Sequence, residues 1–194
     1  NPGVAQHWIV TYPSGERRRI TNDLSAYRAI GLTTDGEKLI TVQAAGLINL
    51  WLVPGDRAAD AISLSTGNIG FYASAGNNVS WTPNGQIAFV SNEAGNADLW
   101  LTDPDGKNRK QLTSNGASNL TPTVSPDGRY IVFVSTRATR RNLWRINIDG
   151  SNPIQLTSGL SDTYPSFTPD GKWVLYTSVD NFKPSTYKVS IDGG

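Results

Sequence analysis

The sequence predicts an all-β fold, a β-propeller of four-stranded antiparallel blades with about four repeats and no significant helix. The first observation is a turn dipeptide that recurs after 49, 43 and 43 residues, at 35–36, 84–85, 127–128 and 170–171. The second is that an aromatic series and a Leu-Thr series keep the same period. The third is that the segments between turns are short and rich in β-branched and aromatic residues. A period of about 40 to 50 residues with four strands is typical of a propeller blade.

The aromatic and Leu-Thr series place the longest interval in the same repeat as the turn dipeptides do. The aromatic positions are separated by 43, 49, 44 and 43 residues: Trp8, Trp51, Trp100, Trp144 and Tyr187. The second series has steps of 44, 48 and 44 residues: Ile20-Thr21, Leu64-Ser65, Leu112-Thr113 and Leu156-Thr157. Because three independent series agree, the repeat is not an accident of composition. We interpret the recurrent tryptophans as core between blades.

Each repeat has the pattern of four strands, which we name A to D in chain order. In the repeat that begins at Asn119, LTPTVS is followed by the turn PDG, RYIVFVS, the loop TRATRRN, LWRINI, the turn DG and SNPIQLT. These segments have four to seven residues and are bounded by Gly, Pro, Asp or Asn. No window of a dozen residues has helical apolar spacing behind a helix cap. The blade is therefore expected to be an antiparallel meander.

The order of strands along the chain leaves the closure of the ring open. The chain begins with strands C and D, continues through three complete blades and ends with strands A, B and C. We treat residues 1–194 as a single β-propeller domain or a segment of one. The chain lacks methionine, and we expect it to be excised from a longer protein. An incomplete propeller would leave blade faces uncovered, and a homo-oligomer is one way to cover them.

The turn dipeptides are interpreted as structure rather than chemistry. In Pro126-Asp127-Gly128 the proline sets φ for a type I turn, and the glycine takes the positive φ that completes the hairpin. Asn84-Gly85 places a neutral residue at the equivalent position. A turn tolerates that exchange, whereas a general base or a metal-binding carboxylate does not.

The residue inventory argues against catalysis and cofactors. The chain has one histidine, His7, no cysteine and no G-x-S-x-G sequence, so neither a serine-hydrolase triad nor a multi-histidine metal site is available. Asp103, Asp105 and Asn108 lie close together, but Ser114 stands where a calcium loop of the EF-hand type has glutamate. We expect no catalytic residue, no metal and no cofactor.

The net charge and the hydropathy of the chain limit which classes of partner it is expected to bind. Seventeen Lys and Arg stand against sixteen Asp and Glu, which leaves a net charge of +1 and no reason to expect a nucleic acid. The apolar runs are far shorter than the roughly 18 residues that a membrane span needs, so we expect no membrane insertion of this segment. A protein or a peptide is the partner that remains.

The repeats resemble those of a known family. The units LTPTVSPDGRYIVFVS and YPSFTPDGKWVLYTS, with the segments DPDGKNRKQLT and NLWRINIDGSNPIQLT, are similar to the WD-type β-propeller repeat of the TolB-like family. Such repeats occur in bacterial periplasmic proteins, before peptidases of the prolyl-oligopeptidase type, and in sensor regions of kinases and transcription regulators. The resemblance covers nearly the whole chain and implies an extracytoplasmic location, periplasmic or secreted, in a bacterium. It leaves the function open, since one fold supports many functions.

The loops opposite the Asp-Gly turns form the face on which we expect binding. The B–C and D–A connections share one end of the blades, and they are longer and more varied than the turns at the other end, as recognition loops on a rigid scaffold are. Aromatic residues and arginine are common interface anchors. A solvated loop for the arginines and packing between blades for Tyr164 remain alternative explanations. The candidate partner-binding residues are Tyr27, Arg28, Phe71, Tyr72, Arg137, Arg140, Arg141, Tyr164, Asn181 and Phe182.

The sequence favours a non-catalytic binding or scaffold propeller that recognises a protein or peptide through this loop face. We expect it to be the sensor part of a larger bacterial receptor or kinase. Two alternatives stay open. In the first, the chain is the accessory propeller of a peptidase or hydrolase whose catalytic domain lies outside this sequence. In the second, it is a structural repeat segment that self-associates.

Overall fold

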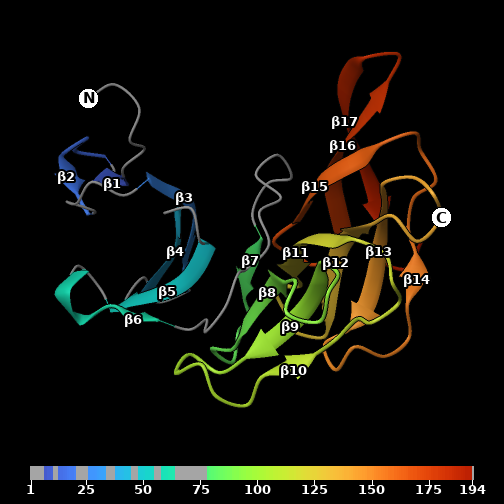
Figure 1. Ribbon diagram of the computed structural model, residues 1–194. Helices are drawn as coiled ribbons and strands as arrows, with labels where there is room; N and C mark the ends of the chain where they lie inside the picture. Colours follow the sequence, from blue (N-terminus) through green and yellow to red (C-terminus); the bar gives the residue numbers. More distant parts are fainter. Residues whose placement is uncertain are drawn as a thin grey trace. The chain divides into compact units, whose positions relative to one another are not determined.

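The fold was derived from a computed structural model, which describes residues 7–10, 13–20, 26–33, 38–44, 48–54, 58–63 and 78–193 (Figure 1). The described residues form antiparallel sheets and contain no α-helix; one turn of 3-10 helix, η1, spans Ala58–Asp60. The all-β prediction is therefore confirmed. The chain divides into two compact units, residues 1–69 and 70–194.

The first unit contains a two-stranded and a four-stranded sheet. The two-stranded sheet pairs β1 (Trp8–Val10) with β2 (Arg17–Arg19). In the four-stranded sheet the strands lie in chain order: β3 (Ala26–Leu32), β4 (Lys38–Ala44), β5 (Ile48–Pro54) and β6 (Ile62–Ser63). These sheets match the predicted strands C and D followed by one complete blade. The turn dipeptide at 35–36 lies outside the described residues.

The second unit contains three sheets, each with its strands in chain order (Figure 1). The first sheet is made of β7 (Val79–Trp81), β8 (Ile87–Ser91), β9 (Asp98–Thr102) and β10 (Lys110–Gln111). The second is made of β11 (Asn119–Val124), β12 (Tyr130–Ser135), β13 (Asn142–Asn147) and β14 (Ile154–Gln155). The third has three strands, β15 (Asp162–Phe167), β16 (Trp173–Asp180) and β17 (Lys183–Ser190). The predicted A, B, C order of the last repeat is observed.

The register of the strands explains the aromatic series. In the four sheets of the described residues that have both strands, the aromatic residue of strand C lies directly opposite one residue of strand B. In three of them that residue is also aromatic, and aromatic pairs across strands stabilise a sheet. The pairs are Thr41 with Trp51, Phe89 with Trp100, Phe133 with Trp144, and Tyr176 with Tyr187.

The core of the second unit is one continuous cluster that spans all three sheets. Its centre is made of residues on strands B and C, and Leu99, Ile131, Phe133 and Leu143 are fully buried. The tryptophans of the C strands do not belong to this centre. Trp100 and Trp144 are half-buried, and Trp144 packs against the cluster. The fully buried position on the same strand is taken by the neighbouring leucine, Leu99 or Leu143.

The turns between strands A and B have the chemistry that the sequence predicts. Asp127 accepts hydrogen bonds from the Ser125 hydroxyl at 2.7 Å and from the Arg129 backbone N–H at 3.0 Å. Asn84 accepts a hydrogen bond from the Thr82 hydroxyl in the equivalent turn, so the neutral residue keeps the first of these interactions. Gly128 has a φ of 72° and Gly85 a φ of 85°. These residues close hairpins.

Candidate functional site

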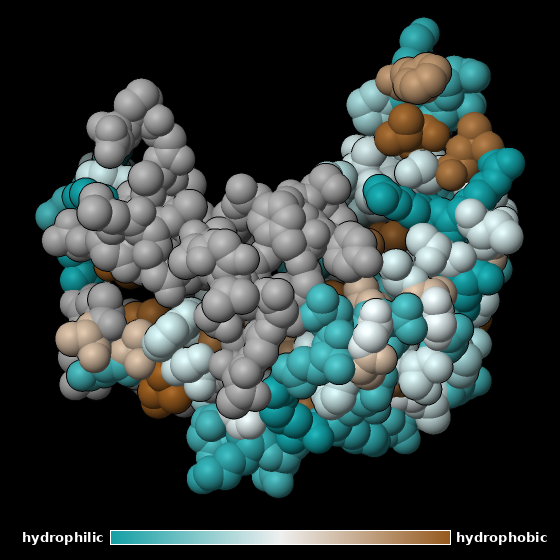
Figure 2. Space-filling view, in the orientation of Figure 1, coloured by the Kyte–Doolittle hydropathy of each residue, from teal (hydrophilic) through white to brown (hydrophobic). Residues whose placement is uncertain are grey.

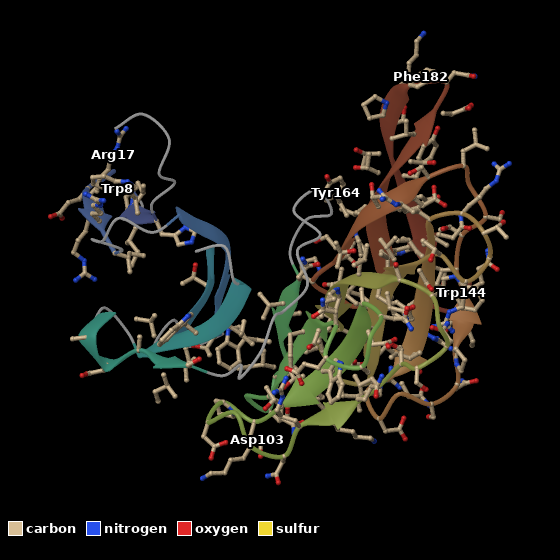
Figure 3. All side chains as sticks on the ribbon, viewed as in Figure 1. Trp8, Arg17, Asp103, Trp144, Tyr164 and Phe182 are labelled. Atoms are coloured by element: carbon tan, nitrogen blue, oxygen red, sulfur yellow. The ribbon has the colours of Figure 1, made fainter. Side chains whose placement is uncertain are left out.

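The two ends of the blades in the second unit have different chemistry. Figure 3 shows Asp103, in the turn between β9 and β10, and Phe182, at the tip of the β16–β17 hairpin, at opposite ends of this unit. We call the end with the Asp-Gly turns the turn end and the end with the B–C loops the loop end. The candidate residues of this unit that the structure describes lie at the loop end.

Most carboxylates of the turn end that the structure describes accept hydrogen bonds within their own turns. Asp149 accepts hydrogen bonds from the backbone N–H and the hydroxyl of Ser151, at 2.9 and 2.6 Å. Hydrogen bonds from Asn108 and Gln86 lower the pKa of Asp103. Among the described residues no group of three or more His, Asp or Glu side chains is placed to hold a metal ion. The turn end therefore has no assembled metal site in the part of the chain that is described.

Three B–C connections of equal length in the sequence repeat lie at the loop end, at residues 92–97, 136–141 and the equivalent 179–184. The first two turn back by a hydrogen bond between residues three apart, and Gly95 and Thr139 occupy the same position in them with φ of 97° and 67°. Thr139 is β-branched, and such residues rarely adopt a positive φ. The second loop therefore holds a strained residue where the first has glycine.

The third loop is a regular hairpin instead. The β16–β17 ladder continues through two further residue pairs, the last of them Asp180 with Lys183. The two residues between them, Asn181 and Phe182, have φ of 46° and 63°, as a type I′ turn requires. Glycine is the residue that this second position favours. Phe182 is held there 99% exposed.

The apolar exposure at the loop end is concentrated beside this hairpin. Tyr164 on β15 is 52% exposed and Leu160, in the connection that precedes β15, is 51% exposed. Tyr164 has a φ of 55° in a β-bulge, which turns its side chain out of the regular alternation. Figure 2 shows hydrophobic atoms at the upper end of the β15–β17 sheet, between hydrophilic neighbours. Leu160 was not predicted, although an apolar residue in a Gly-Ser loop is the signal that would have found it.

Arg137 is part of the scaffold rather than a free charge. Its guanidinium lies 4.6 Å from the centre of the Trp144 ring and 5.4 Å from that of Phe133. It also donates to the Ser135 hydroxyl at 3.1 Å. Burial lowers the pKa of Arg137. In the preceding blade Arg109 covers Phe89 and Trp100 in the same way, so we assign Arg137 to packing.

Arg140 and Arg141 are exposed, and none of the ion pairs among the described residues involves either of them. Their loop is connected to the β16–β17 hairpin indirectly, through Ser161 and Asp162 at the start of β15. The Asp162 N–H donates to the Arg141 carbonyl at 2.7 Å, and the Val179 N–H donates to the Ser161 carbonyl at 3.0 Å. The two arginines are therefore held near the base of the hairpin that carries Phe182.

The remaining candidates cannot be assigned to this surface. Tyr27 and Arg28 lie on β3 of the first unit, but their side chains are outside the described residues. Phe71 and Tyr72 lie outside the described residues altogether. The candidate residues that the structure describes at the loop end of the second unit are thus Arg137, Arg140, Arg141, Tyr164, Asn181 and Phe182, and the structure adds Leu160.

A buried polar network lies under these loops at each junction between blades. At the first junction Asp98 on strand C accepts hydrogen bonds from the Thr113 hydroxyl at 2.7 Å and the Asn119 amide at 3.0 Å. At the second junction the residue types are exchanged, and Asn142 on strand C donates to Asp162 on strand A at 3.1 Å. Each junction holds one acid and one amide. These pairs fix the bases of the loops.

The chain is similar to TolB proteins over its whole length. The model of the TolB beta propeller domain matches residues 1–194. A Tol-Pal system protein TolB from Geobacter sulfurreducens is 53% identical over 45 residues, which are 23% of this chain and 10% of that protein. A TolB homologue from Chlorobium luteolum is 27% identical over 128 residues, 65% of this chain and 28% of that protein. The chain therefore matches less than a third of these relatives' length.

Solved structures confirm the fold. TolB from Acinetobacter baumannii has a TM-score of 0.80 and 16% identity, over 96% of this chain and 46% of that one. Puromycin hydrolase has a TM-score of 0.68 and 13% identity, over 91% of this chain and 29% of that one. At these identities the likeness is one of fold alone. In the described part of the chain, no helix is both long and apolar enough to span a membrane.

Proposed function

Because the chain belongs to the TolB β-propeller domain family, we propose that it is a non-catalytic binding propeller that recognises a protein partner through its loop end. Relatives of this chain are named as proteins of the Tol-Pal system, which supports a protein partner in an extracytoplasmic compartment of a bacterium. A larger receptor or scaffold is the context we propose for it.

The observation that carries this proposal is the contrast between the two ends of the second unit. Four exposed turn aspartates accept hydrogen bonds within their own turns: Asp105, Asp127, Asp149 and Asp170. At the loop end, Arg140 and Arg141 are exposed and Phe182 is exposed almost completely. Exposed aromatic and arginine side chains on one rigid face are typical of protein interfaces.

Site-specific photo-crosslinking in the source bacterium tests this proposal. A benzophenone amino acid is placed at Arg140 or Phe182 at the loop end, and at Asp105 or Asp149 at the turn end as matched controls. All four positions are exposed, so the substitutions should leave the fold intact. We expect a discrete protein adduct from the loop-end positions and none from the turn-end positions. Adducts from the turn end alone, or from no position, would contradict the proposal.

A further inference from the structure

The second unit contains two Asn-Gly dipeptides whose surroundings differ. Asn84-Gly85 lies in the turn between β7 and β8, and Asn115-Gly116 lies in the connection between β10 and β11. We propose that Asn115 is a site of spontaneous deamidation in the folded protein, whereas the fold protects Asn84 from the same reaction. This inference does not depend on the proposed function.

Deamidation of an Asn-Gly dipeptide needs no enzyme. The backbone nitrogen of the glycine loses its proton and attacks Cγ of the asparagine; a C–N bond forms, ammonia leaves and a cyclic succinimide remains. Water then opens either of the bonds that join the succinimide nitrogen to the former asparagine, and the product is aspartate or isoaspartate. Glycine favours the reaction because it has no side chain to hinder the approach of its nitrogen.

The attacking nitrogen is available at Gly116 and occupied at Gly85. Among the hydrogen bonds of the described residues none has the Gly116 N–H as its donor, and Gly116 is exposed in a bend. The Gly85 N–H donates to the Thr82 carbonyl at 3.0 Å, and the Thr82 N–H donates to the Gln86 carbonyl at 2.9 Å in the same hairpin. Attack on Asn84 therefore requires this hairpin to open, whereas attack on Asn115 breaks no hydrogen bond of the Gly116 N–H.

The side chain of Asn115 lies between two groups of donors. One end of its amide is 3.0 Å from Asn119 Nδ2, and the other end is 2.8 and 3.1 Å from Nε and Nη2 of Arg137. When the oxygen faces Arg137, the guanidinium N–H groups stabilise the negative charge that develops on this oxygen during the attack. Asn84 has a neutral donor in that role, the Thr82 hydroxyl. The electrophile is therefore better activated at Asn115.

The product fits this position better than asparagine does. An amide has an acceptor at one end and a donor at the other, so in either orientation its NH2 group faces a donor of Asn119 or of Arg137. A carboxylate accepts hydrogen bonds at both ends and pairs with the guanidinium. Deamidation of Asn115 thus completes the hydrogen bonds at the first junction between blades and adds a negative charge to the loop end.

The experiment incubates the native 194-residue chain in mildly alkaline buffer, beside a second sample in concentrated urea. Peptide mapping by mass spectrometry follows the replacement of NH2 by OH at each asparagine, and chromatography separates the aspartate and isoaspartate products. Asn84 is the matched control within the same molecule, since it is also exposed and also precedes glycine. The variant Arg137→Met removes the guanidinium and keeps an unbranched side chain at this position.

In the native chain we expect Asn115 to deamidate at least about fivefold faster than Asn84, because breaking the Gly85 hydrogen bond alone slows the attack by about that factor. In urea the two rates should become similar. Arg137→Met should slow the reaction at Asn115 by about tenfold, since a charged hydrogen bond is lost, and leave Asn84 unchanged.

Equal rates at the two sites in the native chain, or faster loss at Asn84, would overturn the inference. The same ratio of rates in urea as in the native chain would also overturn it, because the local sequence alone would then explain the difference. An unchanged rate at Asn115 in Arg137→Met would overturn the role of Arg137 and leave the free Gly116 N–H as the cause.

Discussion

Single residues set the local strain at the loop end, and Thr139 is the clearest case. It stands 44 residues after Gly95, at the same position of the next B–C loop, and both have positive φ. A left-handed conformation costs an ordinary residue about 1–2 kcal/mol, and glycine adopts it without that cost. The 136–141 loop therefore holds Thr139 at a positive φ, although threonine prefers a negative φ.

Replacing Thr139 with glycine should stabilise the chain by about 1 kcal/mol, because the strain is removed and only part of the gain is lost to the greater freedom of unfolded glycine. The reverse change, Gly95→Thr, should destabilise it by a similar amount. Urea unfolding followed by tryptophan fluorescence measures both. A destabilised Thr139→Gly variant would show that the threonine hydroxyl, which donates to the Ala138 carbonyl at 2.5 Å, matters more than the strain.

Gly150 and Gly193 occupy the same turn of successive blades but differ in their surroundings. Both have positive φ, 90° and 86°. A Cβ on Gly150 would lie 2.8 Å from the backbone oxygen of Leu112 in the neighbouring blade, whereas one on Gly193 would meet nothing within 4 Å. Gly150→Ala should therefore cost about 3 kcal/mol and Gly193→Ala about 1 kcal/mol. Equal thermal unfolding midpoints for the two variants would show that the neighbouring blade shifts away from the added methyl group at residue 150 without loss of stability.

Asp127 predicts a pH dependence. A hydrogen bond from the Ser125 hydroxyl, followed by one from the Arg129 N–H, lowers the pKa of Asp127 to about 2. A carboxylate with a lowered pKa stabilises the folded state above its unfolded pKa, near 4, and this contribution is lost as pH falls toward 2. Because the side chain is 45% exposed, we expect about 1 kcal/mol rather than the full shift. The difference in unfolding free energy between the native chain and Asp127→Asn should shrink between pH 4 and pH 2. A difference that stays constant over this range would show that protonation of Asp127 does not change the stability of the fold.

At the scale of strands, the exchange of acid and amide between junctions makes pairing specific. Asp98 faces Asn119 at one junction, and Asn142 faces Asp162 at the next. Two acids at one buried junction would repel, and two amides would lack the charge-assisted hydrogen bond. A strand C therefore accepts the strand A that follows it better than the strand A of the other junction.

A double-mutant cycle at the first junction tests this specificity. Asn119→Asp should cost about 3–5 kcal/mol, since it buries a second carboxylate beside Asp98. Asp98→Asn should cost about 1–3 kcal/mol. The double variant reproduces the arrangement of the second junction and should recover at least about 1 kcal/mol relative to Asn119→Asp. Additive losses in urea unfolding would show that the two residues act independently.

The strands were predictable because their signals are local. Turn dipeptides and alternating segments gave the sheets in order, including three strands in the last repeat. The long β16–β17 hairpin was not predictable, since the loop that contains Asn181 and Phe182 has the same length as its equivalents and lacks the glycine typical of such turns. The packing of Arg137 on Trp144 was missed for another reason. An arginine that is exposed in a loop and one that packs on an aromatic ring have the same sequence pattern.

At the scale of the whole molecule, the three sheets of the second unit share one continuous core. The continuous core cluster of the described residues begins at Ala88 and ends at Ile191, all within the second unit. Repeat proteins gain stability from each blade and from the interfaces between neighbours. The three sheets of the second unit share such interfaces, and the strands A and B of one sheet contact the strand A of the next.

The second unit should consequently fold without the first. A fragment of residues 70–194 is expected to unfold in one cooperative thermal transition with a β-type circular dichroism spectrum, because its three sheets share one core cluster whose described residues all belong to this unit. Leu143 is fully buried at the centre of that cluster, so Leu143→Ala should lower the stability of the fragment by about 2–5 kcal/mol. Trp173→Ala is the control, since this residue is 38% exposed and its loss should cost less. A fragment that melts without a cooperative transition would show that the blades need the first unit to hold their core together.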